Sequence, residues 1–279
     1  MKAISNTRLL FTGMVQKPED AIDLATTALL IAKEEYSTLD IDHYLAILDS
    51  YAREIATRII SLNDPESILL QINQYLFKEQ GFRGNGEDYY DPKNSFLNDV
   101  IDRKLGIPIS LSVLYIEIGK RLGIPIQGIG MPGHFIVKYG HSDHAIFIDP
   151  FHHGRLLTEE DCIQTIEDLS QGQMPYHPDF LKPVSNRQIL IRMLYNLKAI
   201  YFNSKEYTKA LEVVERVLLI NPDLPQEIRD RAIIRFNLKE YSPALVDFRL
   251  YLKLTPFAPD EEEMHDYIRK ILGHFAQFN

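Results

Sequence analysis

The sequence predicts an α+β fold with a helical N-terminal region, followed by an all-α domain of helical repeats. Three observations lead to this prediction. Apolar residues recur at three- and four-residue spacings through most of the first hundred residues. Short β-rich runs bounded by glycine, proline and polar residues then lie between residues 126 and 148. Finally, matching segments begin at residues 205 and 239, a period of 239 − 205 = 34 residues. We place the domain boundary after residue 182, so that the two domains cover residues 1–182 and 183–279.

The composition is that of an ordinary globular chain, and it excludes several kinds of partner. The 279 residues include 30 Lys and Arg against 39 Asp and Glu, a net charge of −9. An acidic chain lacks the positive field that nucleic acids and anionic membranes require, so we expect neither as a partner. The single cysteine, Cys162, can form neither an internal disulfide nor a multi-cysteine metal site. The first ten residues contain no long uninterrupted apolar run, and we expect a cytoplasmic protein.

Three amphipathic helices are predicted in the N-terminal region. The first covers residues 20–32 and has acidic residues in its first turn, where the helix dipole favours them. The second covers residues 41–60. The third starts at Asp64-Pro65-Glu66, because proline suits the first helical position. Glycines within residues 81–86 end this helix, and a loop is expected through Asp91-Pro92.

The middle of the chain changes from helix to strand. A short helix is predicted over residues 98–104, and a longer one runs from Pro108 to Leu122, where Gly123-Ile124-Pro125 ends it. Strands are predicted at three β-rich runs, residues 126–129, 135–139 and 145–148. Helices followed by antiparallel strands are typical of an α+β domain.

The C-terminal part resembles the tetratricopeptide repeat, a pair of antiparallel helices with a 34-residue period. The positions that match at this offset are Phe202-Asn203 with Phe236-Asn237, Lys205-Glu206-Tyr207 with Lys239-Glu240-Tyr241, Ala210-Leu211 with Ala244-Leu245, and Pro222 with Pro256. Three residues depart from the repeat pattern: Lys198, Arg231 and Arg235 stand where the family prefers Gly, Leu and Tyr. A terminal capping helix is expected over residues 261–275.

Four polar side chains of the middle segment are candidates for catalysis. His134 starts one predicted strand and Asp149 ends the next, so a hairpin can place the carboxylate where it orients the imidazole. Ser110 and Ser112 lie in the first turns of a predicted helix, where the dipole favours an anion. A serine that faces the imidazole would complete a Ser-His-Asp arrangement. The alternatives are a buried hydrogen bond that joins two strands and serine hydroxyls that bond to the backbone.

Four longer motifs carry a family resemblance. They are residues 89–98, Gly106-Ile107-Pro108-Ile109-Ser110-Leu111-Ser112, Pro132-Gly133-His134-Phe135 and Ile148-Asp149-Pro150-Phe151. In these motifs the chain resembles the transglutaminase-like superfamily, whose core has Cys at a helix start and then His and Asp on successive strands. More closely, it resembles the SirB family of bacterial proteins, which joins a divergent transglutaminase-like domain to C-terminal tetratricopeptide repeats. The resemblance implies a transglutaminase-like, papain-like α+β core.

The nucleophile of the superfamily has no counterpart at the expected position. Enzymes of the superfamily commonly have Gly-x-Cys about 15 residues before Gly-Ile-Pro. Counted back from Gly123-Ile124-Pro125, this spacing puts Pro108 in the cysteine position. The resemblance therefore implies a protein- or peptide-binding module that has lost its catalytic cysteine, with a groove at His134 and Asp149 and the repeats as binding surfaces. The alternative is a hydrolase or acyltransferase of peptide or amide bonds, with His134 as general base and Ser110 or Ser112 as nucleophile.

A surplus of histidines raises the question of a metal ion. Six of them lie between residues 134 and 177, namely His134, His141, His144, His152, His153 and His177. No two stand four residues apart on a predicted helix with a third ligand, so we expect structural or solvated histidines, with no metal ion and no cofactor.

Overall fold

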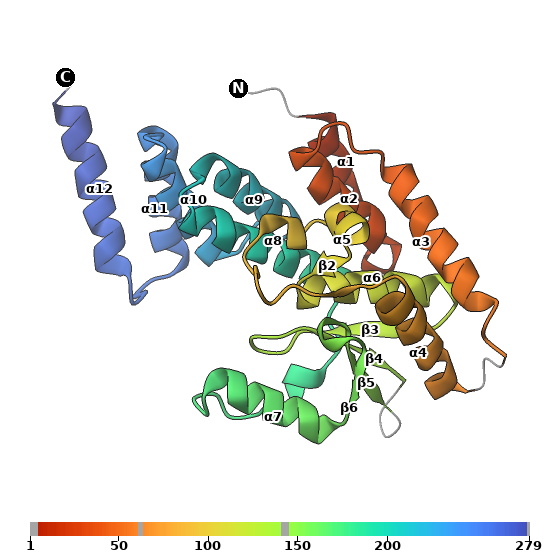
Figure 1. The fold of residues 1–279 in the computed structure, drawn as a ribbon. Coiled ribbons are helices and arrows are strands. Elements are labelled where there is room, and N and C mark those ends of the chain that lie inside the picture. The colour runs from red at the N-terminus through yellow and green to blue at the C-terminus, as the bar shows by residue number, and fades with distance from the viewer. Residues whose placement is uncertain (1–4, 61–63, 141–144, 278–279) are drawn as a thin grey trace. The chain divides into compact units, whose positions relative to one another are not determined.

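The computed structural model describes residues 5–60, 64–140 and 145–277, and Figure 1 shows the fold. The chain divides into two units, Met1–Met193 and Leu194–Asn279, and the division lies within helix α8 (Asn186–Asn203). The domain boundary predicted after residue 182 stays a prediction. The order of elements confirms the predicted fold class, because an α+β region is followed by helices alone. Among the described residues, no helix combines the length and apolar character that a membrane crossing requires.

The N-terminal region is helical, as predicted. Its elements are α1 (Asn6–Val15), the 3-10 turn η1 (Glu19–Ala21), α2 (Leu24–Glu35), α3 (Ile41–Ala56), α4 (Pro65–Asn73), the π-helical turn η2 (Gln74–Glu79), the 3-10 turn η3 (Pro92–Asn94) and α5 (Leu97–Arg103). Helix α2 starts later than predicted, because the Asp23 carboxylate accepts a hydrogen bond from the Thr26 backbone N–H at 2.8 Å and caps the helix there. Helix α3 ends earlier than predicted, with Thr57 as its C-cap.

Helix α6 (Pro108–Arg121) is the centre of the first unit. Proline occupies its first turn as predicted, and every residue from Pro108 to Gly119 is buried. The helix packs against α2, α3 and α5 on one side and against a sheet on the other (Figure 1). Gly119 allows the sheet to approach closely, since a Cβ atom at this position would lie 2.6 Å from Ile126. A helix buried all round is held in place by its neighbours, which makes it a firm support for a site.

The sheet that covers α6 has four antiparallel strands. They are β3 (Ile126–Ile129), β4 (Ile136–Tyr139), β5 (Ile146–Asp149) and β6 (Arg155–Leu157), adjacent in chain order. The three predicted strands are confirmed, and β6 was not predicted. Val137 pairs with Ile148, which sets the start of β4 beside the end of β5. A second, parallel pair joins β1 (Arg83–Gly84) to β2 (Leu105–Gly106), and β1 lies within a segment predicted as a loop.

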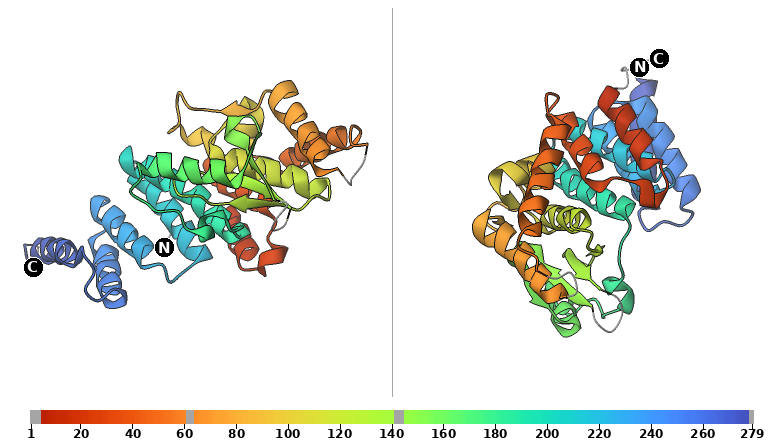
Figure 2. Two further views of the ribbon diagram at one scale, coloured as in Figure 1. Left: turned by 90° about the horizontal axis from the view of Figure 1, so that it is seen from below. Right: turned by 90° about the vertical axis from the view of Figure 1, so that its right-hand side faces the viewer.

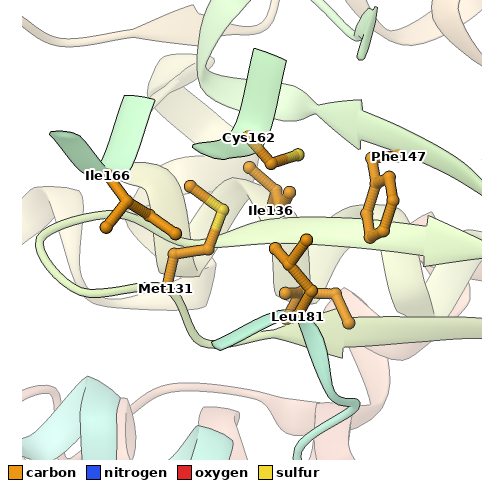
Figure 3. Close-up of a cluster of buried hydrophobic side chains, with 7 residues drawn as sticks. Met131, Ile136, Phe147, Cys162, Ile166 and Leu181 are labelled. Carbon is orange, nitrogen blue, oxygen red and sulfur yellow. The ribbon is translucent and has the colours of Figure 1, made fainter. Parts of the chain in front are cut away.

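Helix α7 (Glu159–Ser170) covers the other face of the sheet. Figure 3 shows the apolar cluster between them, which consists of Ile129, Met131, Ile136, Phe147, Cys162, Ile166 and Leu181. Cys162 is fully buried here, and burial raises the pKa of its thiol to about 12. A thiol with this pKa stays protonated at neutral pH and packs as a small apolar side chain.

The second unit repeats one structural motif. After the C-terminal part of α8, this unit contains α9 (Tyr207–Ile220), α10 (Pro225–Asn237), α11 (Tyr241–Leu254) and α12 (Glu261–Ala276). Helices α9, α10 and α11 lie side by side (Figure 2, teal to blue). The turns before α9 and α11 are alike, because Lys205 and Lys239 both take a left-handed φ, of 61° and 62°. Helix α12 confirms the predicted helix near residues 261–275.

The three departures from the repeat pattern all form ion pairs. Arg231 and Arg235 both bond the carboxylate of Asp247, at 2.7 Å each, and this carboxylate is 3% exposed. Lys198 lies 2.5 Å from the buried carboxylate of Glu227. The basic residues at positions where the repeat family prefers Gly, Leu and Tyr therefore pair with buried carboxylates of neighbouring helices, since a buried carboxylate is costly unless it is paired.

Candidate functional site

The predicted hairpin brings His134 and Asp149 together. His134 directly follows Gly133, whose φ of 73° turns the chain into β4, and Asp149 is the last residue of β5. The Nε2 atom of His134 lies 2.8 Å from Oδ2 of Asp149, and the two side chains are 8% and 7% exposed. The pair is therefore a buried hydrogen bond at one end of a strand pair.

The carboxylate of Asp149 has two differently used oxygen atoms. Oδ1 accepts hydrogen bonds from the backbone N–H groups of Phe151 at 2.9 Å and His152 at 3.2 Å, at the start of the 3-10 turn η5 (Pro150–His152). Oδ2 contacts two imidazoles, Nε2 of His134 and Nδ1 of His152, the second at 2.7 Å. Burial raises the pKa of this carboxyl, but the two imidazoles outweigh burial and hold the pKa below its ordinary value. Asp149 is thus ionised at neutral pH.

His152 is a residue of this site that the sequence analysis did not single out for it. Its side chain is 62% exposed, in contrast to the buried pair beside it, and its ring centroid lies 6.0 Å from that of His134. The sequence contains a usable signal, because an Asp before a Pro-started turn caps that turn and holds the third residue after it nearby. Three potential metal-ligand atoms, from His134, Asp149 and His152, lie within 4.8 Å of one another.

Close contacts hold the turn that carries Asp149 and His152. A Cβ atom at Gly84 in β1 would lie 2.6 Å from the ring of Phe151, so only glycine lets this strand approach the turn. Gly154, with a φ of 73°, ends the turn, and its carbonyl accepts a hydrogen bond from Nδ2 of Asn73 at 2.7 Å. The backbone around the carboxylate is therefore fixed from two sides.

The guanidinium of Arg192 fixes the other side of the pair. It donates hydrogen bonds to the backbone carbonyls of Met131 at 2.9 Å and His134 at 2.8 Å, and it lies over the ring of Phe135. Burial lowers the pKa of Arg192. These contacts hold the backbone of the turn before β4 and leave the imidazole of His134 to Asp149.

The two candidate serines do not join the pair. The Ser110 hydroxyl donates to the carbonyl of Asn94 at 2.6 Å and accepts from the N–H of Ile107 at 3.1 Å, so it caps the start of α6. The Ser112 hydroxyl is buried and has no hydrogen-bond partner among the described residues. Within the same part of the chain, Nδ1 of His134 has no hydrogen-bond partner either, so neither serine bonds to the imidazole. The structure thus assembles His134 with Asp149 and leaves both serines apart from them.

The other histidines of the predicted surplus lie elsewhere. The ring of His153 packs against Phe77 at 6.5 Å between centroids. His177 is 63% exposed and lies 3.4 Å from the carboxylate of Asp179. His141 and His144 lie outside the described residues.

Two protein-family models match successive parts of this chain. Residues 42–195 match the transglutaminase-like superfamily, and residues 197–269 match the tetratricopeptide repeat. A UPF0162 protein of Xylella fastidiosa is 36% identical over 227 residues, which make up 80% of this chain and 81% of that protein. Human F-box only protein 21 is 31% identical over 115 residues, 38% of this chain and 18% of that protein. Among solved structures, a crystal structure of menin covers 97% of this chain and 75% of its own, with a TM-score of 0.43 and 12% identity.

The matched segments agree with the two parts of the fold. The superfamily match includes α6, the four-stranded sheet, and the His134 and Asp149 pair, and the repeat match begins within α8 and ends within α12. The chain belongs to the transglutaminase-like superfamily, is related to the UPF0162 proteins over four-fifths of its length, and carries tetratricopeptide repeats after its superfamily domain.

Proposed function

We propose that this chain is a cytoplasmic protein- or peptide-binding module of the SirB type, whose transglutaminase-like domain has lost the cysteine nucleophile. One observation carries the proposal: no hydroxyl or thiol among the described residues hydrogen-bonds to His134. Pro108, which the motif spacing puts in the cysteine position, occupies the first turn of α6 and has no nucleophilic atom. A histidine–aspartate pair without an adjacent nucleophile lacks the group that would form a covalent intermediate.

The state of Ser110 supports the same conclusion. Its side chain is fully buried, and its hydroxyl proton is directed to the carbonyl of Asn94. To attack a substrate, Ser110 would have to break this bond and leave the start of α6 uncapped. A hydroxyl bonded in this way stabilises the helix start, which is the structural alternative for this residue.

The repeats offer a surface that suits a peptide. A groove of about 410 Å³ lies among α8, α10 and α12, and its lining residues are Lys198, Ala199, Phe202, Asn203, Arg229, Asp230, Ile233, Asp260, Glu263 and Met264. The lining combines apolar side chains with groups of both charges, so it offers contacts to a peptide backbone and to its side chains. Stacked helical repeats commonly bind partners along such surfaces.

A selection experiment tests the binding proposal. A phage-displayed peptide library is selected on the immobilised full chain, and the enriched peptides are measured in solution. We expect Asn203→Arg and Glu263→Arg, which change exposed groove residues, to weaken binding at least tenfold. Arg249→Glu on α11, an exposed residue that does not line the groove, is the matched control and should bind as the wild type does. No enrichment, or equal binding by all four proteins, would contradict the proposal for the repeats.

The alternative is a hydrolase or acyltransferase, and one observation favours it. The Nδ1 atom of His134 has no hydrogen-bond partner in the described part of the chain, so a hydroxyl that moved toward it could be deprotonated. A fluorophosphonate probe that labels reactive serines distinguishes the two functions. We expect no labelling that depends on His134. Labelling of the wild type that disappears in both His134→Ala and Ser112→Ala would establish the enzyme instead.

A further inference from the structure

The carboxylate of Asp149 is shared by two imidazoles, and the binding function proposed above gives the second of them, His152, no role. A structural pair needs one imidazole for one carboxylate oxygen, yet His134 and His152 both contact Oδ2, at 2.8 and 2.7 Å. Two imidazole nitrogens and a carboxylate oxygen in one cluster are ligands that zinc prefers in proteins.

We propose that His134, Asp149 and His152 form a binding site for one divalent transition-metal ion of the zinc type. The three ligand atoms, Nε2, Oδ2 and Nδ1, lie within 4.8 Å of one another. Three protein ligands leave a further position for water or for a donor atom of a bound molecule, as in the open class of zinc sites.

The distances need only a small adjustment. Zinc holds nitrogen and oxygen ligands at about 2.0–2.1 Å in tetrahedral geometry, so neighbouring ligand atoms are about 3.4 Å apart. The two histidine–carboxylate distances are 2.8 and 2.7 Å, and they must open by about 0.6 and 0.7 Å to reach that spacing. The two imidazole nitrogens lie within 4.8 Å of each other and must approach the same spacing. The side chain of His152 is 62% exposed, so it has room to rotate into this arrangement, and its exposure gives a metal ion a path from solvent.

The surroundings hold the carboxylate in the orientation that a metal requires. Oδ1 is occupied by the N–H groups of Phe151 and His152, so Oδ2 is the atom left for coordination. Such outer hydrogen bonds orient ligands in known metal sites. The positively charged guanidinium of Arg192 bonds to the backbone carbonyl of His134, not to its ring.

The protons of the imidazoles do not prevent binding. A neutral imidazole carries its proton on one nitrogen and can transfer it through solvent to the other. In His134 the other nitrogen is Nδ1, which has no hydrogen-bond partner within the described residues and is able to carry the proton. In His152 it is Nε2, on an exposed ring. Besides the change in distances, coordination through the nitrogens that now face Asp149 therefore requires a change of tautomer.

Two histidines four residues apart form a metal site only where both lie on one helix. Here the ligands come from three places: the turn before β4, the end of β5 and the turn η5. The tertiary structure joins them, so the absence of a helical histidine pair in the sequence does not bear on this cluster.

Metal titration of the full chain tests the proposal. The tag-free protein is stripped with a chelator and titrated with Zn²⁺ by calorimetry and with Co²⁺ by visible absorption. We expect one equivalent of Zn²⁺ to bind, and His152→Ala to weaken its affinity at least about tenfold. His177→Ala is the matched control, because His177 is equally exposed (63% against 62%) and also pairs with a carboxylate, that of Asp179.

The exposed histidine decides the outcome, since changing it does not disturb the core. Loss of the Co²⁺ absorption in His152→Ala but not in His177→Ala, with unchanged circular dichroism in both, would support the site. The proposal is refuted if the wild type binds no stoichiometric Zn²⁺. It is equally refuted if His152→Ala and His177→Ala bind Zn²⁺ with the same affinity.

Discussion

Replacing Asp149 with alanine removes a carboxylate that organises the hairpin and the turn after it. The wild-type side chain accepts hydrogen bonds from two backbone N–H groups and contacts two imidazoles. In Asp149→Ala, the buried ring of His134 loses its one side-chain hydrogen bond among the described residues. The N–H groups of Phe151 and His152 lose their acceptor as well. We expect this variant to be clearly less stable than the wild type.

The magnitude follows from which groups water can reach. A buried donor left unsatisfied costs about 1–3 kcal/mol, which applies to the ring of His134. Each backbone N–H costs about 0.5–1.5 kcal/mol, because the turn is only partly buried. The exposed ring of His152 exchanges its bond for water and adds nothing. The free energy of unfolding should therefore fall by about 2–6 kcal/mol in total.

Asp149→Asn separates the hydrogen bonds from the charge. The amide oxygen can keep the two backbone donors, and the amide nitrogen can donate to imidazoles that have changed tautomer, so we expect a loss of about 1 kcal/mol or less at neutral pH. The pKa of Asp149 is lowered in the folded chain, so its charge stabilises the fold above the pKa of the unfolded carboxyl, about 3.9. That contribution is lost as the pH falls through the lower, folded pKa. Asp149→Asn should lack this part of the acid sensitivity.

Urea denaturation followed by circular dichroism measures these changes, and hydrogen exchange at β4 and β5 locates them. Asp179→Ala is the control, because its carboxylate also pairs with a histidine but is exposed, and we expect little change. Equal unfolding midpoints for Asp149→Ala and the wild type would refute the reasoning. So would a stability loss in Asp149→Asn as large as that in Asp149→Ala.

Three further predictions concern the rest of the fold. Gly154→Ala should destabilise the hairpin strongly, because residue 154 has a left-handed backbone conformation and the new Cβ atom would lie 2.2 Å from Asn73. Thermal melts measure the change, and an unchanged melting midpoint would contradict this prediction. Asp247→Ala should lower the free energy of unfolding by about 3 kcal/mol, which is the lower end of the range for breaking a buried ion pair. The value is low because the two arginine partners keep about a fifth of their side-chain surface exposed, and urea denaturation measures the loss. Cys162 should not react with iodoacetamide in the native chain at neutral pH, because burial raises its pKa to about 12, and rapid labelling detected by mass spectrometry would show the thiol to be accessible.

Much of the fold follows from local patterns in the sequence. The helix from Pro108 and the three strands after it are predicted within a residue or two, because proline, glycine and β-rich runs act over a few neighbouring residues. The repeat is equally clear, since its 34-residue period requires only a comparison of the chain with itself. The late start of α2 was missed because Glu19–Ala21 form a separate 3-10 turn, and the helix begins only after Asp23, whose carboxylate caps it.

The contacts of the candidate site could be predicted from the sequence only in part. The pairing of His134 with Asp149 could be predicted, because a hairpin has one simple way to bring the start of one strand to the end of the next. Serine hydroxyls that bond to the backbone were one of the predicted alternatives, but the carbonyl that accepts from Ser110 could not be predicted, since it belongs to Asn94 in the turn η3. The addition of His152 depends on a turn held by contacts with β1.

The sequence by itself determined the order of helices and strands, the period of the repeats and the His134–Asp149 pair, because short-range spacing and periodicity encode them. Only the tertiary structure decided which groups share the carboxylate, which hydroxyls are already bonded and which surface remains exposed. The physical reason is that hydrogen bonds and burial are set by neighbours in space, and those neighbours come from parts of the chain that are far apart in sequence.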